Sequence, residues 1–378
     1  MKELLGDIER WRAAGKRAAI ARVVDIEGSG PRDPGAAMAV NDAGEVAGSV
    51  SGGCVEGAVL TEGLSVLEKG KPKLVTYGIA DDDAFAVGLT CGGTIHIFIA
   101  PPGDHDEEIE AVLRSGEPAV LATVIEGLNP GARGVPVEVG AKLLARPGAP
   151  AIGSLGDPDL DRVVERDALG ELEAARTGVR HYGVHGEARR EEGVAVFIES
   201  FALPPRMVIF GAIDFTAALA KLAKLLGYRV TVCDARAVFA TPQRFPMADE
   251  VVNDWPDRYL AKVGSELGPR DAVCVLTHDP KFDVPAIAAA LETKAGYLGA
   301  MGSRRTHDQR MQRLREAGVG DAGIARVMAP VGLDIGARTP EETAVSICAE
   351  IIATRTGKTG ASLRATDGPI HPPPGAGG

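Results

Sequence analysis

The feature that most constrains the fold is a repeat in the first half of the chain. Residues 35–78 align with residues 140–183 without a gap, so that each position has its counterpart 105 residues later. Each copy reads as a strand, a turn, a strand ending in Gly-Ser, a short loop, a helix and a strand ending in Tyr-Gly. We therefore predict a duplicated α/β domain over residues 1–203, with copies at about 15–101 and 116–204 that share one core.

A different pattern begins after the linker at 202–205. Residues 206–236 read as a buried strand, a turn, a helix and a second strand, which is the opening of a doubly wound α/β sheet. The last helix has a clear start, because Thr339 and Glu342 form a capping box around Pro340. We predict a Rossmann-like parallel-sheet domain over 204–356 and a flexible Pro/Gly-rich tail over 357–378.

Charge and composition narrow the classes of function. The net charge of −11 and the isoelectric point of about 5.3 argue against nucleic acid as a partner. The first residues lack the basic start and apolar core of a signal peptide, and no stretch reaches the ~18 apolar residues of a membrane span, so we expect no membrane association. The five scattered cysteines then predict reduced thiols in a cytoplasmic protein.

Two cysteines lie beside pairs of glycines. Cys54 follows Gly52 and Gly53 at the start of a predicted helix, where unpaired backbone amides would stabilise a thiolate. Cys91 precedes a second Gly-Gly pair, and neither cysteine has a counterpart in the second copy, where Asp159 corresponds to Cys54. Each alone is also typical of a small buried thiol, but together they favour a shared site for a soft ligand. No CxxC pair is present to complete a structural zinc site.

The second domain has the position of a dinucleotide site without its fingerprint. Gly211 keeps the first tight turn, but Ile213 and Thr216 replace the next two glycines of G-x-G-x-x-G. Asp234 ends the second strand, where a ribose-binding acid would lie. We expect NAD(P) to bind poorly in the usual manner.

Three further segments carry polar residues in positions that favour ligand binding. His278 follows a predicted strand, and Ser303 and Arg304 open a predicted helix, which is a reasonable seat for an anion. Arg32 lies in a glycine-rich loop that suits a phosphate or a pterin. An ordinary turn, a capped helix and a hydrogen-bonded loop histidine are the alternatives at these places.

Several long motifs, in order, resemble a known family. They are "GSVSGGCVEGAV", "GLTCGG", "LTHDPKFD", "YLGAMGSRRTH" and "PVGLDIGARTPEETAVSICAEII", and the likeness spans residues 10 to 355. The chain resembles the XdhC/CoxI family, accessory proteins of xanthine dehydrogenase and CO dehydrogenase. The resemblance implies binding of the molybdenum cofactor, with Cys54 and Cys91 as the two motif cysteines. This sequence departs from the family at "GAIDFT", where a glycine-rich "GAGHVG" turn is usual.

These observations predict an accessory protein that binds molybdenum cofactor and assists its sulfuration and insertion into a molybdenum hydroxylase. The expected partners are that hydroxylase, a cysteine desulfurase and a second copy of the chain in a homodimer. Five scattered cysteines cannot ligate the two iron–sulfur clusters of a complete xanthine dehydrogenase. An NAD(P)-dependent oxidoreductase and a thiol-based metal or redox sensor are the alternatives.

The candidate residues follow from these motifs and from the resemblance. The candidate cofactor-binding residues are Arg32, Gly52, Gly53, Cys54, Glu56, Cys91, Gly92, Gly93, Gly211, Asp234, His278, Ser303 and Arg304, and the candidate metal ligands are Cys54 and Cys91.

Overall fold

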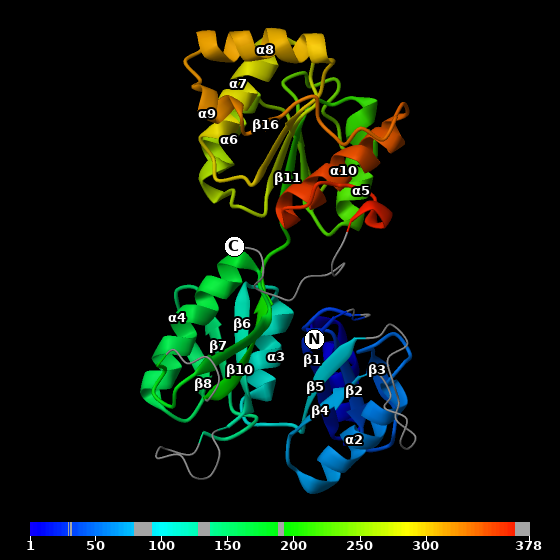
Figure 1. Ribbon diagram of the computed structural model, residues 1–378, viewed down its shortest axis with the longest axis vertical. Coiled ribbons are helices and arrows are strands. Elements are labelled where there is room, and N and C mark those ends of the chain that lie inside the picture. The colour runs from blue at the N-terminus through cyan, green and yellow to red at the C-terminus, as the bar shows by residue number, and fades with distance from the viewer. Residues whose placement is uncertain (29, 31, 79–92, 128–136, 188–192, 367–378) are drawn as a thin grey trace. The chain divides into compact units, whose positions relative to one another are not determined.

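The computed structural model describes residues 1–28, 30, 32–78, 93–127, 137–187 and 193–366. The described part of the chain divides into two compact units, the first ending at Leu203 and the second beginning at Pro204 (Figure 1). Each unit is described by itself below.

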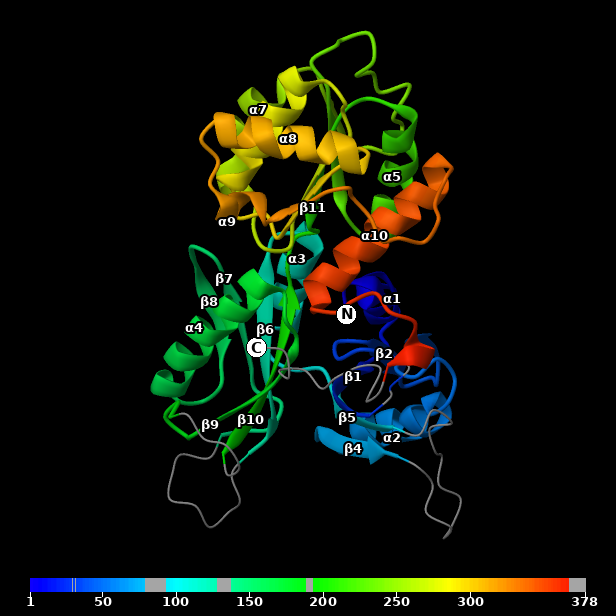
Figure 2. The ribbon, with the colours of Figure 1, turned by 45° about the horizontal axis from the view of Figure 1, so that its top comes forward.

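The first unit contains two five-stranded antiparallel sheets with the same strand order. The first sheet runs β3-β2-β1-β5-β4 and the second β8-β7-β6-β10-β9 (Figure 2). Their elements are α1 (Leu5–Ala13), β1 (Ala18–Glu27), β2 (Ala37–Asn41), β3 (Val46–Gly48), α2 (Glu56–Lys69), β4 (Lys73–Tyr77), β5 (Thr94–Ala100), α3 (Asp106–Ser115), β6 (Ala119–Glu126), β7 (Lys142–Arg146), β8 (Ala149–Ser154), α4 (Pro158–Ala174), β9 (Gly178–Tyr182) and β10 (Val194–Phe201).

The repeat predicted from the sequence is confirmed by two glycines that occupy equivalent positions in the two copies. Gly48 and Gly153, 105 residues apart, have φ angles of +76° and +86°. A Cβ atom at either would lie 2.4 or 2.3 Å from the carbonyl oxygen of the neighbouring strand, of Ala37 or Lys142. These two acceptors are themselves 105 residues apart. Both copies therefore need glycine at the same corner of the fold.

One face of each sheet packs on α2 or α4, and the other face packs partly on α1 or α3 and partly on the second sheet. Helix α2 covers the first sheet with Val59 and Val66, and α4 covers the second with Leu160 and Val164. The opposite faces meet in a core that includes the following residues from both sheets: Val24, Phe98, Ile125, Ala195 and Phe197. Because strand side chains alternate between faces, this arrangement explains why β1, β5, β6 and β10 are buried on both sides.

The second unit is a doubly wound sheet, as the sequence predicts. Its six strands are all parallel and run β13-β12-β11-β14-β15-β16, the order 3-2-1-4-5-6 of the Rossmann fold. Its elements are β11 (Arg206–Phe210), α5 (Asp214–Leu225), β12 (Arg229–Cys233), β13 (Glu250–Val252), α6 (Pro256–Val263), β14 (Ala272–Val275), α7 (Pro280–Leu291), β15 (Tyr297–Ala300), α8 (Arg304–Glu316), α9 (Asp321–Ile324), β16 (Val327–Met328) and α10 (Pro340–Thr356).

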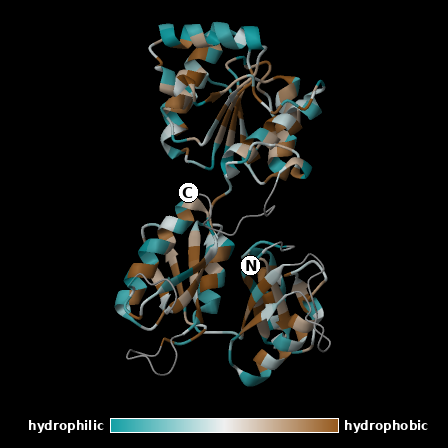
Figure 3. Cartoon of the chain, in the orientation of Figure 1, coloured by the Kyte–Doolittle hydropathy of each residue, from teal (hydrophilic) through white to brown (hydrophobic). Residues whose placement is uncertain are grey.

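Helices cover both faces of this parallel sheet. Helices α5 and α10 pack on one face around Leu219 and Ile347, and α6, α7 and α8 pack on the other around Ile287 and Leu314. Figure 3 shows the resulting contrast between apolar strands and the mostly polar surface of α8. The strand order reverses between β11 and β14, so the crevice at their carboxyl ends is where such a fold binds ligands.

Candidate functional site

Cys54 lies on the loop between β3 and α2, two residues before the helix begins. Its side chain is half-buried and packs against the core under α2, while Gly52 and Gly53 beside it are exposed. The two glycines have φ angles of +75° and +120°, which other residues rarely adopt. A Cβ atom at either would meet no described atom within 4 Å, so the backbone on this side of the loop is open to an incoming group.

The carboxylate of Glu56 organises the loop. Its Oε1 accepts from the hydroxyl of Ser49 at 2.6 Å and from the amide of Ser51 at 2.9 Å. Its Oε2 accepts from the hydroxyl of Ser51 at 2.5 Å and from the amide of Gly53 at 2.9 Å. Partial burial opposes ionisation, but the hydrogen bonds from the two serines and the loop backbone outweigh it and lower the pKa of Glu56 to about 2.

Ser51 holds the backbone of the cysteine itself. Its Oγ accepts from the amides of Cys54 at 3.0 Å and Val55 at 2.9 Å. From the sequence we expect the amides around Cys54 to face a thiolate, and this expectation is wrong for Gly53, Cys54 and Val55. These donors are already used by Ser51 and Glu56, so the loop fixes the position of the sulfur and leaves these three amides no proton to donate to it.

The second repeat keeps the framework of this loop and loses the thiol. The hydroxyl of Ser154 donates to Asp161 at 2.7 Å, as Ser49 donates to Glu56 105 positions earlier. Asp159, the counterpart of Cys54, is an exposed residue of α4 that forms an ion pair with Arg162 at 3.0 Å. The hydroxyl–carboxylate pair is therefore structural in both repeats, and the cysteine is special to the first.

The other described cysteines differ from Cys54 in their burial. Cys233, Cys274 and Cys348 are all buried in the second unit. Burial raises the pKa of Cys233 and Cys348 to about 12 and raises the pKa of Cys274 as well. These thiols behave as small apolar core groups.

Cys91 is the predicted partner of Cys54. Cys91 and Gly92 lie outside the described residues, and Gly93 follows them as a buried residue just before β5. Among the described residues no group of three His, Cys, Asp or Glu side chains is arranged to hold a metal ion. Arg32 is exposed and forms a long ion pair, in which its Nη2 lies 4.0 Å from Oε1 of Glu3. The shared Cys54–Cys91 site stays a prediction.

Gly211 lies at the switch point of the parallel sheet. Its φ angle is +113°, and a Cβ atom there would lie 2.9 Å from Cγ2 of Thr277, two residues after β14. Thr216, at the third glycine position of the fingerprint, is fully buried and donates its hydroxyl to the carbonyl of Gly211. The turn is therefore closed by contacts within the protein, although Gly211 makes the sharp turn that the sequence predicts.

Asp234 is also engaged inside the protein. Its Oδ2 accepts from the amide of Ala212 at 2.8 Å and from Nη2 of Arg236 at 2.7 Å, and its Oδ1 accepts from Nε of Arg236 at 2.9 Å. Burial raises the pKa of this carboxyl, but the hydrogen bonds of Arg236 and Ala212 outweigh that effect and the net pKa is lowered. An acid that is paired in this way has little capacity left for a ribose hydroxyl.

The remaining predicted residues lie at neighbouring strand ends. His278 is exposed after β14, and Ser303 caps α8 by accepting from the amide of Thr306 at 3.2 Å. Arg304 is the exposed first residue of that helix. These side chains therefore lie at one edge of the sheet, after β14 and at the start of α8.

A buried ion pair under this edge was not predicted from the sequence. Nη2 of Arg310 donates to Asp283 at 2.8 Å and to the carbonyl of Met301 at 2.7 Å. The hydroxyl of Thr277 also donates to Asp283. Burial raises the pKa of Asp283 despite the opposing effect of Arg310. One feature of the sequence could have indicated this pair. Arg310 lies four residues before Leu314, on the apolar side of an otherwise polar helix.

Comparisons with known proteins agree with both units. The model of the XdhC and CoxI family matches residues 11–78 and 112–183, one segment in each repeat, and the model of the XdhC Rossmann domain matches residues 207–351. The chain belongs to the XdhC and CoxI family.

Two curated relatives of this family member align over most of their length. A probable xanthine dehydrogenase subunit from Bacillus subtilis is 29% identical over 346 residues, covering 90% of this chain and 94% of that protein. The molybdenum cofactor insertion chaperone PaoD of Escherichia coli is 29% identical over 342 residues, covering 90% of this chain and 85% of that protein. A crystal structure of a xanthine dehydrogenase from Bacillus halodurans has the same fold, with a TM-score of 0.65, 24% identity, and coverage of 95% of this chain and 98% of that one.

One further finding concerns membranes. Among the described residues, no helix is both long enough and apolar enough to cross a bilayer.

Proposed function

We propose that this protein is a chaperone that binds molybdenum cofactor and helps to insert it into a hydroxylase of the xanthine dehydrogenase type. The observation that carries the proposal is the loop of Cys54. A half-buried thiol lies on a backbone fixed by Ser51 and Glu56, and it occurs in only one of two repeats with the same framework. The name of the relative PaoD, which matches 90% of this chain, supports the same class of function.

The residues of the loop suit a sulfur-bearing cofactor as cargo. A cysteine sulfur is a soft ligand that suits the molybdenum of such a cofactor better than a hard cation. The open backbone at Gly52 and Gly53 leaves room for a flat group to approach. The carboxylate of Glu56 lies in the same loop as Cys54. Because its oxygens accept hydrogen bonds from serine hydroxyls and backbone amides, its negative charge repels an anionic cofactor less strongly.

Finer parts of the proposal concern the partners. Cys91 would be the second thiol of the site, the cofactor would be sulfurated with a cysteine desulfurase as sulfur donor, and the chaperone would act as a homodimer. Of the two alternative functions, the NAD(P) enzyme receives less support, because the internal pairing of Asp234 and the closed turn at Gly211 disfavour dinucleotide binding.

The test uses the full chain under anaerobic conditions. Protein is incubated with cofactor released from a purified molybdoenzyme and then desalted, and retained cofactor is measured as pterin fluorescence after oxidation and as molybdenum by mass spectrometry. We expect wild type to retain cofactor, Cys54→Ser and Cys91→Ser each to lose it at least tenfold, and Asp159→Ala to behave as wild type. Asp159→Ala is the matched control because it lies at the corresponding position of the second repeat.

Retention by Cys54→Ser equal to that of wild type would exclude the loop as the cofactor site. A second readout is the activation of a cofactor-free hydroxylase by the loaded chaperone. Retention without activation of any hydroxylase of this type would contradict the insertion part of the proposal.

A further inference from the structure

The first unit contains a cavity that is separate from the Cys54 loop. It has a volume of about 150 Å³ and lies on the face of the first sheet away from α2. Side chains of β1 alternate across this sheet: Ala19 and Ala21 belong to the core under α2, whereas Ile20 and Arg22 line the cavity. Cys54 packs against the core under α2, on the other side of the sheet.

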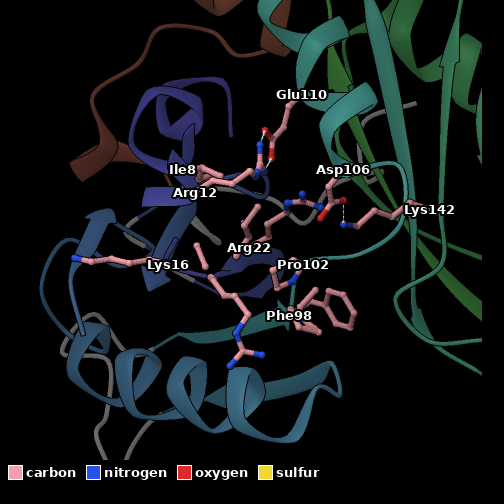
Figure 4. A pocket seen from close by; sticks show the side chains of 14 residues that line it. Ile8, Arg12, Lys16, Arg22, Phe98, Pro102, Asp106, Glu110 and Lys142 are labelled. Atoms are coloured by element: carbon pink, nitrogen blue, oxygen red, sulfur yellow. Dashed lines mark hydrogen bonds and ion pairs between the residues drawn. The ribbon is translucent and has the colours of Figure 1, made fainter. Parts of the chain in front are cut away.

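The walls of the cavity are predominantly basic. Residues from α1, β1, β5, α3 and β7 contribute to it, and Figure 4 shows Arg22 beside Asp106 and Lys142, with the side chain of Lys16 extending away from them. The basic side chains are Arg12, Lys16, Arg17, Arg22 and Lys142, and the acidic ones are Asp106 and Glu110.

Both acidic side chains are used by basic neighbours in the walls. Arg12 binds Glu110 through two hydrogen bonds of 2.9 and 2.7 Å, and Lys142 forms an ion pair with Asp106 (Figure 4). These pairs fix the walls and leave little acceptor capacity for other cations.

Two of the remaining cations are paired at the rim. Lys16 lies 2.6 Å from Glu45, and Nε of Arg17 lies 3.8 Å from Asp42. Both basic side chains are at least 31% exposed, so these pairs are solvated and weak. The third cation, Arg22, differs from these two because it is buried.

Arg22 is buried, with 4% of its surface exposed. Its Nε lies 3.5 Å from Oε2 of Glu199 without a hydrogen bond, and both atoms lack a hydrogen-bond partner among the described residues. Its Nη2 contacts the sulfur of Met1 at 2.8 Å, which is a poor acceptor, while the Met1 amino group lies 3.9 Å from the other oxygen of Glu199. A buried guanidinium with unused donors is costly unless an acceptor reaches it.

Lys142 shares this wall with Arg22. Burial lowers the pKa of Lys142, Asp106 opposes that effect, and the positive charge of Arg22 lowers the pKa further. Two neighbouring cations thus repel each other at one end of the cavity. An anion placed between them would relieve that repulsion.

The rest of the lining is apolar. It is formed by Ile8, Ile20, Phe98, Pro101 and Pro102. A volume of about 150 Å³ is roughly ten times what one water molecule needs, which corresponds to a ligand of about ten non-hydrogen atoms. We infer that this cavity is a binding site for a small organic oxyanion, with its charged group at Arg22 and Lys142 and its apolar body against Phe98 and the two prolines.

The test measures binding of phenyl phosphate to the full chain by calorimetry and by the shift of the unfolding temperature. Phenol and inorganic phosphate are the comparison probes. We expect phenyl phosphate to bind at least tenfold more tightly than inorganic phosphate and phenol to show no binding. Absence of phenyl phosphate binding at about 10 mM, or equal binding of the two phosphates, overturns the assignment.

Variants locate the site and guard against misfolding. Arg22→Met is combined with Glu199→Gln, because removing Arg22 alone would leave the buried Glu199 with only the Met1 amino group as a counter-charge. Lys142→Met is combined with Asp106→Asn for the same reason. Each pair should weaken phenyl phosphate binding at least tenfold, whereas the control Arg166→Met, an exposed arginine of α4, should not change it. Unchanged binding in both folded double variants places the ligand elsewhere and overturns the inference.

Discussion

The hydroxyl of Ser51 lies 2.5 Å from Oε2 of Glu56, and this contact fixes the backbone that carries Cys54. Ser51 accepts two amides with the same oxygen that donates to Glu56, so each side chain holds the other in place. The loop is therefore rigid because of a carboxylate and a hydroxyl, while its glycines supply the backbone angles.

The first prediction is that Glu56→Gln destabilises the first unit by about 1–2 kcal/mol, because charge-assisted hydrogen bonds become neutral ones in a partly solvated loop. Urea unfolding of the Trp255→Phe protein measures this, since Trp11 then reports on the first unit alone. Glu62→Gln on α2, a partly exposed residue that forms an ion pair with Lys73, is the control, with an expected change below about 0.5 kcal/mol.

The same variant should change the response to acid. The pKa of Glu56 is about 2 in the folded protein and about 4.5 when unfolded, so its ionised form stabilises the fold above pH 4.5. That contribution is lost as the pH falls from about 4.5 toward 2. The difference in stability between wild type and Glu56→Gln should therefore be full at pH 7 and smaller at pH 3. An equal difference at both pH values would contradict the role of the charge.

The second prediction concerns the reactivity of the thiols. Cys233, Cys274 and Cys348 are buried with raised pKa values, so they should resist alkylation in the native protein. Cys54 is half-buried beside an open backbone and should react first among these four. Peptide mass spectrometry after short treatment with iodoacetamide, with and without urea, measures the order. Native labelling of Cys274 ahead of Cys54 would contradict it.

The repeat shows how much of the fold the sequence could predict. A constant spacing of 105 residues already implied a duplicated α/β domain, because the positive-φ glycines Gly35 and Gly48 recur as Gly140 and Gly153. The structure adds one element to each repeat, since α1 precedes β1 as α3 precedes β6. These helices lie outside the gapless alignment, where the spacing changes, so the copies predicted at 15–101 and 116–204 do not include them.

The candidate site was less predictable because its contacts join distant positions. Gly52, Gly53 and Cys54 could be found from local spacing. The pairing of Asp283 with Arg310 joins two different helices, and its 27-residue separation leaves no periodic signal. The basic cavity likewise draws Arg22 from one repeat and Lys142 from the other, so only the packing of the two sheets brings them together.

The third prediction is weak binding of NAD(H) and NADP(H). Asp234 is paired with Arg236 and Ala212, and Ile213 and Thr216 fill the places of two fingerprint glycines. We expect dissociation constants above about 100 μM, equivalent to less than roughly 5.5 kcal/mol. Isothermal calorimetry on the full chain measures this. Binding of either dinucleotide at low micromolar concentration would show that the turn opens for a ligand.

The fourth prediction concerns the buried pair in the second unit. The side chains of Arg310 and Asp283 are 3% and 4% exposed, and Arg310→Met would leave Asp283 charged and without its cation. We expect a loss of about 3–5 kcal/mol in the free energy of unfolding of this unit. Trp255, whose ring lies 5.0 Å from that of Phe282, reports the transition in a Trp11→Phe background.

The double variant Arg310→Met with Asp283→Asn separates loss of the charge pair from loss of packing. It should recover most of the stability, because the remaining amide can still accept from Thr277 and no buried charge is left.

In the single variant the pKa of Asp283, already raised by burial, should rise further. A carboxyl with a raised folded pKa destabilises the fold once the pH exceeds its unfolded pKa, so the deficit of Arg310→Met should shrink as the pH falls from 7 to 5. If the double variant is as unstable as the single one and the deficit does not change with pH, Arg310 stabilises the strand ends through its aliphatic packing and its bond to Met301 instead of through its charge.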